Sequence, residues 1–202
     1  EKRITLLNKN KKIKLYKITL NSYLAKKEKK FLKKNAPFLN INIDYKPFFS
    51  DDFRDIPGMI SLSYICKVSR KNQNLIQLSG QGSDEIISDY YNPNTNSRRS
   101  DIKGNWSKAS KPWPNFYGKW NKINLGITER IAGAHSIETR YPFLDYDLVQ
   151  AYLSMPAKLK SKDYKAPINF ILKKLSFPYT DIKRGFHGFK TKYNNPYNSK
   201  NS

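Results

Sequence analysis

The chain has 202 residues, 38% of them hydrophobic and 14% aromatic, which indicates a globular rather than a disordered protein that can bury the core of one domain. Its formal net charge is +22, from 38 Lys and Arg against 16 Asp and Glu. Such a charge raises the question of a nucleic-acid or anionic-membrane partner.

The basic residues are mostly lysines, and they are spread from Lys2 to Lys200 rather than gathered in one arm. We interpret this spread as a compositional bias toward Lys and Asn, and we expect no specific nucleic-acid partner. No apolar run approaches the length of a membrane span, so we expect no membrane partner either. The single cysteine, Cys66, excludes a disulfide framework. We expect it to be a buried structural thiol in a reducing, cytoplasmic compartment.

The first ninety residues alternate between strand-like and helix-like patterns. Apolar residues that recur at every second position predict strands, over 12–20, 41–45 and 75–78, the last of a buried type. Apolar residues at helical spacing predict helices, over 23–38, 60–71 and 83–91. This order predicts an α/β fold with a parallel sheet and helices on both of its faces.

The second half is predicted to be mainly helical. Residues 92–118 are rich in Asn, Ser and Pro, which predicts a long loop packed by its aromatic side chains. Helical spacing then predicts three helices, over 120–134, 145–155 and 168–175. Pro167 suits the first turn of the last helix. We expect one partial domain over 1–188 and a disordered tail over 189–202.

The most informative stretch is the loop at 79–85, SGQGSDE, between a predicted strand and a predicted helix. Gly80 and Gly82 allow a tight turn whose N–H groups can approach an anion. The start of a helix at Ser83 adds partial positive charge, which also favours phosphate. The stretch lacks the lysine of a Walker A loop and the third glycine of the dinucleotide fingerprint.

Two acids close this loop, Asp84 and Glu85. Carboxylates beside a phosphate would repel it unless a cation lies between them, so we expect them to bind Mg²⁺. The alternative is structural: Ser83 caps the helix, and the two acids complement its dipole.

A second cluster of charges lies at 138–145, ETRYPFLD. Pro142 keeps the residue before it out of the helical region, so the stretch is expected to be extended. Glu138 and Arg140, two residues apart, then point to the same side. Such a pair either orders a loop or presents a charge to a ligand. Asp145 is placed to cap the next helix.

Both segments resemble the asparagine synthetase family. Residues 79–85 are very similar to its Ser-Gly-Glu-Gly-Ser-Asp-Glu loop, and Tyr90 falls where the family has a tyrosine. Residues 138–145 closely resemble its Glu-x-Arg-x-Pro-Phe-Leu-Asp signature, and 181–186 resemble its Arg-Pro-Lys-x-Gly-Phe stretch. The resemblance covers about 12–186 and extends to β-lactam synthetases and lasso-peptide cyclases. It implies part of an adenine-nucleotide α-hydrolase-like fold.

The resemblance implies an ATP-dependent amide-forming ligase like asparagine synthase (glutamine-hydrolysing), with ATP and Mg²⁺ as cofactors. ATP activates a carboxylate, that of aspartate or another small acid, as an acyl adenylate. Ammonia from a glutaminase domain, upstream or in trans, then attacks it. The resemblance assigns catalytic roles to Lys183, Gln81, Glu138 and Arg140. It assigns nucleotide binding to Ser79, Gly80, Gly82, Ser83 and Lys165, and Mg²⁺ binding to Asp84 and Glu85. Homodimerisation stays open.

The chain departs from the family at several positions. Gln81 stands where asparagine synthetases have Glu, and a neutral amide cannot act as a base, so the carboxylate substrate stays open. Ser88 and Asp89 replace a Gly-Gly pair, which we expect to reshape the substrate side, and Asp181 replaces an Arg. The family's Ser-Gly-Gly-x-Asp-Ser loop and glutaminase domain are expected upstream of Glu1. We therefore expect the 202-residue chain alone to be inactive.

Two other classes of function remain as alternatives. The chain could be a non-catalytic remnant that keeps the fold for interaction, although the charged residues retained at 79–85 and 138–145 argue against drift. It could also be a basic nucleic-acid-binding module, for which strongly salt-dependent binding would be the sign. No nucleic-acid-binding motif is visible in the sequence.

Overall fold

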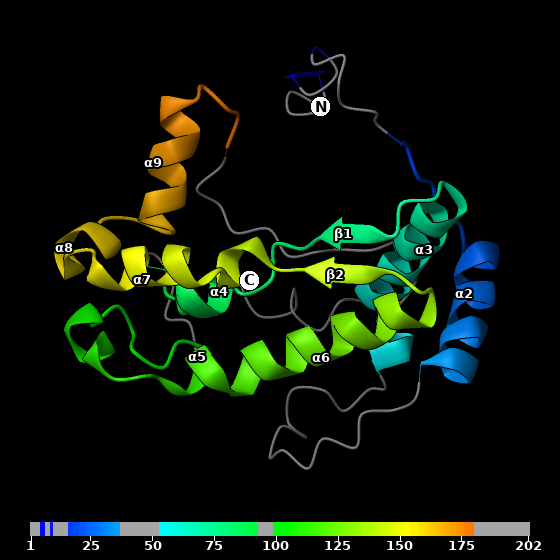
Figure 1. Ribbon diagram of the computed structural model, residues 1–202, viewed down its shortest axis with the longest axis horizontal. Coiled ribbons are helices and arrows are strands. Elements are labelled where there is room, and N and C mark those ends of the chain that lie inside the picture. Colours follow the sequence, from blue (N-terminus) through cyan, green and yellow to red (C-terminus); the bar gives the residue numbers. More distant parts are fainter. Residues whose placement is uncertain (1–4, 7–8, 10–15, 37–52, 93–98, 180–202) are drawn as a thin grey trace, which may run out of the picture. The chain divides into compact units, whose positions relative to one another are not determined.

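A computed structural model describes residues 5–6, 9, 16–36, 53–92 and 99–179 (Figure 1). The chain divides into two compact units. Unit 1 comprises Glu1–Lys17, Leu78–Gly126 and Thr139–Lys183. Unit 2 comprises Ile18–Gln77, Ile127–Glu138 and Arg184–Ser202. The division falls within the long helix α6 (Lys119–Ala134) and within both strands, so these elements contribute to each unit.

In unit 2, α2 (Ser22–Asn35) packs beside α3 (Pro57–Lys71), and the short helix η1 (Phe53–Asp55) contacts both (Figure 1). Asn21 caps α2, since its Oδ1 accepts a hydrogen bond from Leu24 N at 2.9 Å. Apolar residues at helical spacing face the core of this unit. They are Ala25, Leu32, Ile60, Cys66, Ile127 and Ile131.

Cys66 is fully buried and not disulfide-bonded, as predicted for a structural thiol. Burial raises the pKa of its thiol to about 11, so the thiol stays protonated and unreactive at neutral pH.

Unit 1 is built from short helices around an aromatic core. The helices are α4 (Ser83–Ile86), η2 (Trp106–Ser110), α5 (Pro114–Tyr117), η3 (Pro142–Leu144), α7 (Tyr146–Ser154), α8 (Ala157–Lys160) and α9 (Ala166–Lys174). Trp106 packs edge-on against Trp113 and Tyr152, with ring centroids 6.0 and 5.6 Å apart. Ile86, Ile87 and Val149 complete this core.

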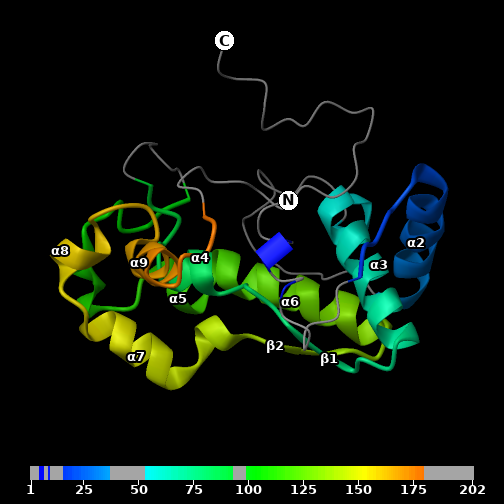
Figure 2. The same ribbon diagram turned by 90° about the horizontal axis from the view of Figure 1, so that it is seen from above.

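The sheet in the described part of the chain has two strands, β1 (Ile76–Leu78) and β2 (Glu138–Arg140), which lie side by side in both views (Figure 1, Figure 2). Glu138 N donates to Leu75 O and Ser79 N donates to Arg140 O, each at 2.8 Å. Along these bonds the residue numbers rise in the same direction in both strands, from Leu75 to Ser79 and from Glu138 to Arg140, so the strands are parallel. The pairing places the loop that follows β1 beside the turn that follows β2.

Several predicted elements are confirmed. Helices predicted at 23–38, 60–71, 120–134, 145–155 and 168–175 are present as α2, α3, α6, α7 and α9. Asp145 caps α7, since its Oδ1 accepts from Leu148 N at 3.1 Å. The α/β character is confirmed only in part: helices predominate in the described residues, and the two-stranded sheet does not establish an adenine-nucleotide α-hydrolase-like fold.

Other predictions are wrong. Residues 16–20, predicted to be part of a strand, form none, and the helix predicted at 83–91 ends after one turn. That helix stops because Asp89 and Tyr90 take positive φ angles of 41° and 58°, which no α-helix contains. The strand at 75–78 is not buried, since Ile76 is 59% exposed and Leu78 is 75% exposed. The predicted loop at 92–118 contains η2 and α5.

The strand predicted at 41–45 and the tail at 189–202 lie outside the described residues. Among the helices that the structure describes, none has the length and apolar character that a membrane crossing requires.

Candidate functional site

The glycine loop after β1 is held against the turn after β2 within unit 1. Gly82 takes a left-handed φ of 91°, and a Cβ at this position would lie 2.3 Å from Leu144 Cδ2. The two segments singled out in the sequence are therefore neighbours at Gly82 and Leu144, as they are at Ser79 and Arg140. Around Gly80, by contrast, no atom lies within 4 Å of a Cβ position, so the loop is open there.

The two glycines give a matched pair of variants. Gly82→Ala should destabilise unit 1 by about 2–4 kcal/mol, because it adds left-handed strain to a steric overlap with Leu144. Gly80→Ala should change the free energy of unfolding by less than about 1 kcal/mol. Urea unfolding followed by tryptophan fluorescence measures both, since all three tryptophans lie in unit 1. Equal effects of the two variants would contradict the packing of Gly82.

Glu85 stabilises this loop through buried hydrogen bonds. Its side chain is 2% exposed, and its Oε2 accepts from Gly82 N at 3.1 Å. Its Oε1 accepts from the Tyr90 hydroxyl and, at 3.0 Å, from Asn124 Nδ2. Burial, and then the negative charge of Glu85, raise the pKa of Tyr90, so its hydroxyl remains a donor. Both carboxylate oxygens of Glu85 thus bond to the surrounding protein.

The side chain of Asp84 forms an ion pair with Lys165. Lys165 Nζ lies 2.5 Å from Asp84 Oδ1 and 3.4 Å from Ser83 Oγ. The two charged side chains are 32% and 22% exposed for Asp84 and Lys165. Lys165 takes a left-handed φ of 54° at the N-cap of α9, so its backbone adopts a conformation that is rare for a lysine. The Tyr164 hydroxyl donates to the same carboxylate oxygen at 3.4 Å.

The remaining predicted site residues fall into three groups. Gln81 N donates to Ser79 Oγ at 3.3 Å, which tightens the loop. Glu138 and Arg140 are exposed on β2 while Thr139 between them is buried, so the predicted alternation is confirmed for 138–140. The prediction that all of 138–145 is extended is wrong, because Pro142–Leu144 form the short helix η3. Lys183 lies outside the described residues.

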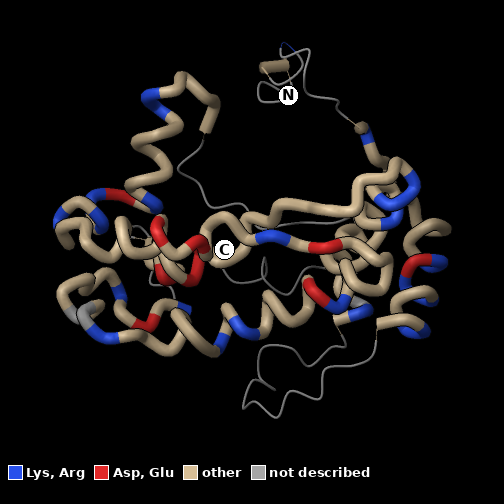
Figure 3. Tube along the Cα trace, in the orientation of Figure 1, with Lys and Arg blue, Asp and Glu red and all other residues tan. Residues whose placement is uncertain are grey.

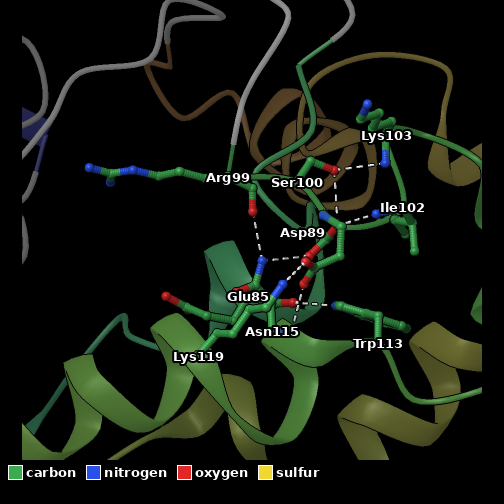
Figure 4. A network of polar contacts seen from close by, with 10 residues as sticks. Glu85, Asp89, Arg99, Ser100, Ile102, Lys103, Trp113, Asn115 and Lys119 are labelled. Carbon is green, nitrogen blue, oxygen red and sulfur yellow. Dashed lines mark hydrogen bonds and ion pairs between the residues drawn. The ribbon is translucent and has the colours of Figure 1, made fainter. Parts of the chain in front are cut away.

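Asp89 is a residue whose role sequence reasoning missed (Figure 4). Its carboxylate is fully buried. Its Oδ2 accepts from Ser100 Oγ at 2.9 Å, from Asp101 N at 2.7 Å and from Ile102 N at 2.9 Å. Burial raises the pKa of Asp89 although these hydrogen bonds act to lower it. The signal in the sequence was an acid two residues after the apolar pair at 86–87, a place where a charge needs buried partners.

Asn115 extends this network to α5. Its Nδ2 donates to Asp89 Oδ1 at 3.1 Å and to Arg99 O at 2.7 Å, and its backbone N donates to Asp101 Oδ2 at 2.8 Å. Trp113 Nε1 donates to Glu85 O at 3.0 Å (Figure 4). Polar contacts therefore connect the loop at 99–102, α5 and the helix that carries Asp84 and Glu85.

The donor set around Asp84 suits a magnesium ion that is shared with phosphate. Among the described residues, no group of three or more His, Cys, Asp or Glu side chains could hold a metal ion by itself. Mg²⁺ is usually held by one or two carboxylates together with substrate phosphates rather than by a cage of protein ligands alone. One accessible carboxylate beside one ammonium group fits that mode: Asp84 would hold the ion, and Lys165 would bind phosphate oxygens.

Comparison with known proteins agrees with the resemblance seen in the sequence. Residues 115–175 match the sequence model of the asparagine synthase family. This match contains the segment 138–145 and Lys165, and it leaves the glycine loop at 79–85 outside. No curated protein and no solved structure matches the chain significantly. Over residues 115–175 the predicted resemblance is confirmed, and this part of the chain is similar to the asparagine synthase family, a family of ligase-type enzymes whose members use ATP.

Proposed function

We propose that the chain is part of an ATP-dependent amide-forming ligase similar to asparagine synthase (glutamine-hydrolysing). The observation that carries this proposal is the pairing of Asp84 with Lys165 at the glycine loop. A carboxylate for Mg²⁺ and an ammonium for phosphate, placed 2.5 Å apart, form a charge pattern complementary to a magnesium–nucleotide complex.

The roles of the two acids differ in this proposal. Asp84 would hold Mg²⁺, which would supply positive charge beside the phosphates. Glu85 orients the loop, because its oxygens already bond to Gly82, Tyr90 and Asn124. The sequence-based assignment of Mg²⁺ to both acids is thereby narrowed to Asp84.

The loop itself would contribute backbone donors to the nucleotide. The open surroundings of Gly80 leave room for a phosphate close to the main chain. Ser79 follows β1 and Ser83 begins α4, and the hydroxyl of Ser83 lies 3.4 Å from Lys165 Nζ. Gly82 N is occupied by Glu85, so its role is to shape the loop rather than to bind phosphate.

The reaction would activate a carboxylate, aspartate or another small acid. A free carboxylate is a poor electrophile, and its adenylate is reactive because AMP is a good leaving group. Arg140 and Glu138 on β2 would orient the substrate, and Lys183 would neutralise the departing pyrophosphate. Gln81 would position the substrate by hydrogen bonds, since a neutral amide cannot accept a proton as a base.

Ammonia would come from a glutaminase domain upstream or in trans, and the enzyme would work in the cytoplasm. The unpaired Cys66 agrees with a reducing compartment.

Lys165 provides the experiment. Lys165→Met should weaken binding of Mg·ATP at least tenfold, because a phosphate loses an ammonium partner. Lys158→Met removes an exposed lysine from α8 of the same unit and should leave the affinity within about twofold. Isothermal titration calorimetry at fixed Mg²⁺ gives both constants. Equal affinity of the two variants would remove Lys165 from the proposed site and favour a chain that keeps the fold without the activity.

A further inference from the structure

Five lysines of unit 2 lie on one face of α2. Six of the 14 residues of this helix are lysines. Five of them are exposed, namely Lys26, Lys27, Lys30, Lys33 and Lys34. They are spaced three, four and seven residues apart, so they share one side of the helix. We call these five residues the α2 lysine face; Figure 3 shows blue segments, which mark Lys or Arg, along α2.

The opposite side of α2 is turned to the core of unit 2. Ala25, Glu28 and Leu32 are buried there, at the same three- and four-residue spacing. Glu28 is the one acidic residue of the helix, and it is fully buried. The exposed face of α2 therefore carries positive charge with no carboxylate of the helix among it.

The charge of Glu28 is directed to the interior. Its Oε1 accepts from Ser63 Oγ at 2.7 Å and lies 3.1 Å from His135 Nε2. Its Oε2 accepts from Lys67 Nζ at 3.2 Å. These three partners occupy the carboxylate, so it does not offset the charges of the α2 lysine face.

Like charges three or four residues apart on a helix repel one another. The α2 lysine face contains several such pairs, among them Lys26 with Lys30 and Lys30 with Lys34. A polyanion laid along this face would relieve that repulsion and release its own bound counterions.

Tyr23 adds an aromatic ring on the same side of the helix. It is 61% exposed and lies three, four and seven residues before Lys26, Lys27 and Lys30. Lys27 Nζ lies 4.5 Å from the centre of its ring. Exposed aromatic rings beside basic side chains are the surface on which proteins stack the bases of single-stranded nucleic acids.

We infer that the α2 lysine face binds the phosphate backbone of single-stranded nucleic acid without sequence preference. The α2 lysine face binds phosphate charge and offers one aromatic ring for stacking, so it does not distinguish one base sequence from another. An anionic membrane is a poorer match, because the apolar residues Ala25 and Leu32 are buried and give the helix no apolar side to insert. This binding is independent of the proposed nucleotide site, which lies in unit 1.

Fluorescence anisotropy of a labelled 20-nucleotide oligouridylate tests this inference with the full chain. For five phosphate contacts, the logarithm of the binding constant should fall with the logarithm of salt concentration with a slope of about −3.5. The triple variant Lys26→Gln, Lys30→Gln and Lys34→Gln should bind at least tenfold more weakly and lower that slope by about 2. Gln preserves helix propensity, and circular dichroism verifies that α2 is intact.

The control removes the same charge elsewhere. Lys122→Gln, Lys158→Gln and Lys174→Gln replace three exposed lysines of unit 1. This variant should bind the oligonucleotide within threefold of the wild type. Equal weakening by both triple variants would mean that net charge alone attracts the oligonucleotide, and would overturn the inference. Tighter binding to phosphatidylserine vesicles than to the oligonucleotide at the same salt concentration would overturn it as well.

Discussion

Replacing Asp89 by alanine should lower the free energy of unfolding of unit 1 by roughly 3–5 kcal/mol. The substitution leaves buried donors without an acceptor, namely Ser100 Oγ, Asp101 N, Ile102 N and one bond of Asn115 Nδ2. Each buried polar group left unsatisfied costs about 1–3 kcal/mol, and partial relaxation keeps the total below the sum. Tryptophan fluorescence during urea unfolding reports this unit selectively.

Asp147→Ala is the matched control, since Asp147 is an exposed acid in the first turn of α7 in the same unit. It should cost less than about 1 kcal/mol. If Asp89→Ala and Asp147→Ala had equal effects, Asp89 would not hold the loop at 99–102.

The pH dependence of the stability that Asp89 contributes has a definite sign. Burial raises the pKa of the Asp89 carboxyl in the folded state, so the folded chain binds this proton more tightly than the unfolded chain does. The stability linked to this group is therefore fully present below the unfolded pKa of about 3.9 and is lost as the pH rises through the folded pKa. The destabilisation caused by Asp89→Asn should accordingly be larger near pH 4 than at pH 7.

Replacing Glu28 by alanine should destabilise unit 2 by roughly 3–5 kcal/mol. The carboxylate is fully buried between α2, α3 and the residue that follows α6, where His135 also stacks on Phe31 at 4.4 Å. Removing it leaves His135, Ser63 and Lys67 without their common acceptor and opens a cavity, and each buried polar group left unsatisfied costs about 1–3 kcal/mol. Hydrogen exchange of the α2 and α3 amides measures the loss, because unit 2 has no tryptophan.

Glu129→Ala, an exposed acid of α6 in the same unit, should cost about 1 kcal/mol or less. Burial alone would raise the pKa of Glu28, but hydrogen bonds from His135, Ser63 and Lys67 outweigh it and lower the pKa. The linked stability is therefore present above the unfolded pKa of about 4.3 and is lost as the pH falls through the folded pKa. Protection of α2 that does not decline at acid pH would contradict this reading of Glu28.

The helices were predictable where local signals agreed. In α3, α6 and α7 the apolar residues recur at helical spacing, and Pro167 and Asp145 mark helix starts. The strand predicted at 12–20 is absent over its described residues, 16–20, because a short alternating pattern forms a strand only when a neighbouring strand supplies hydrogen bonds. The end of α4 could not be predicted, since the positive φ angles of Asp89 and Tyr90 depend on distant partners.

The site was predictable as two segments but not as a set of contacts. The sequence indicated that 79–85 and 138–145 resemble the same family, and the structure adds that they meet, since Gly82 lies against Leu144. It could not distinguish the surroundings of Asp84 and Glu85, because their partners Lys165 and Asn124 lie about 80 and 40 residues further along the chain. Adjacent residues on a helix point in different directions, so the two acids meet different surroundings.

Titration of Mg·ATP into the wild-type chain and its Asp84→Asn variant tests the proposed ligase site most directly. Asn preserves the shape of the side chain but removes the charge that Mg²⁺ requires. The account predicts binding that depends on Mg²⁺, is at least tenfold weaker in Asp84→Asn, and is unchanged in Asp147→Asn, the same substitution on α7. Binding of equal strength in all three proteins, or binding that persists after chelation of Mg²⁺, would contradict the assignment of this site to a magnesium–nucleotide complex.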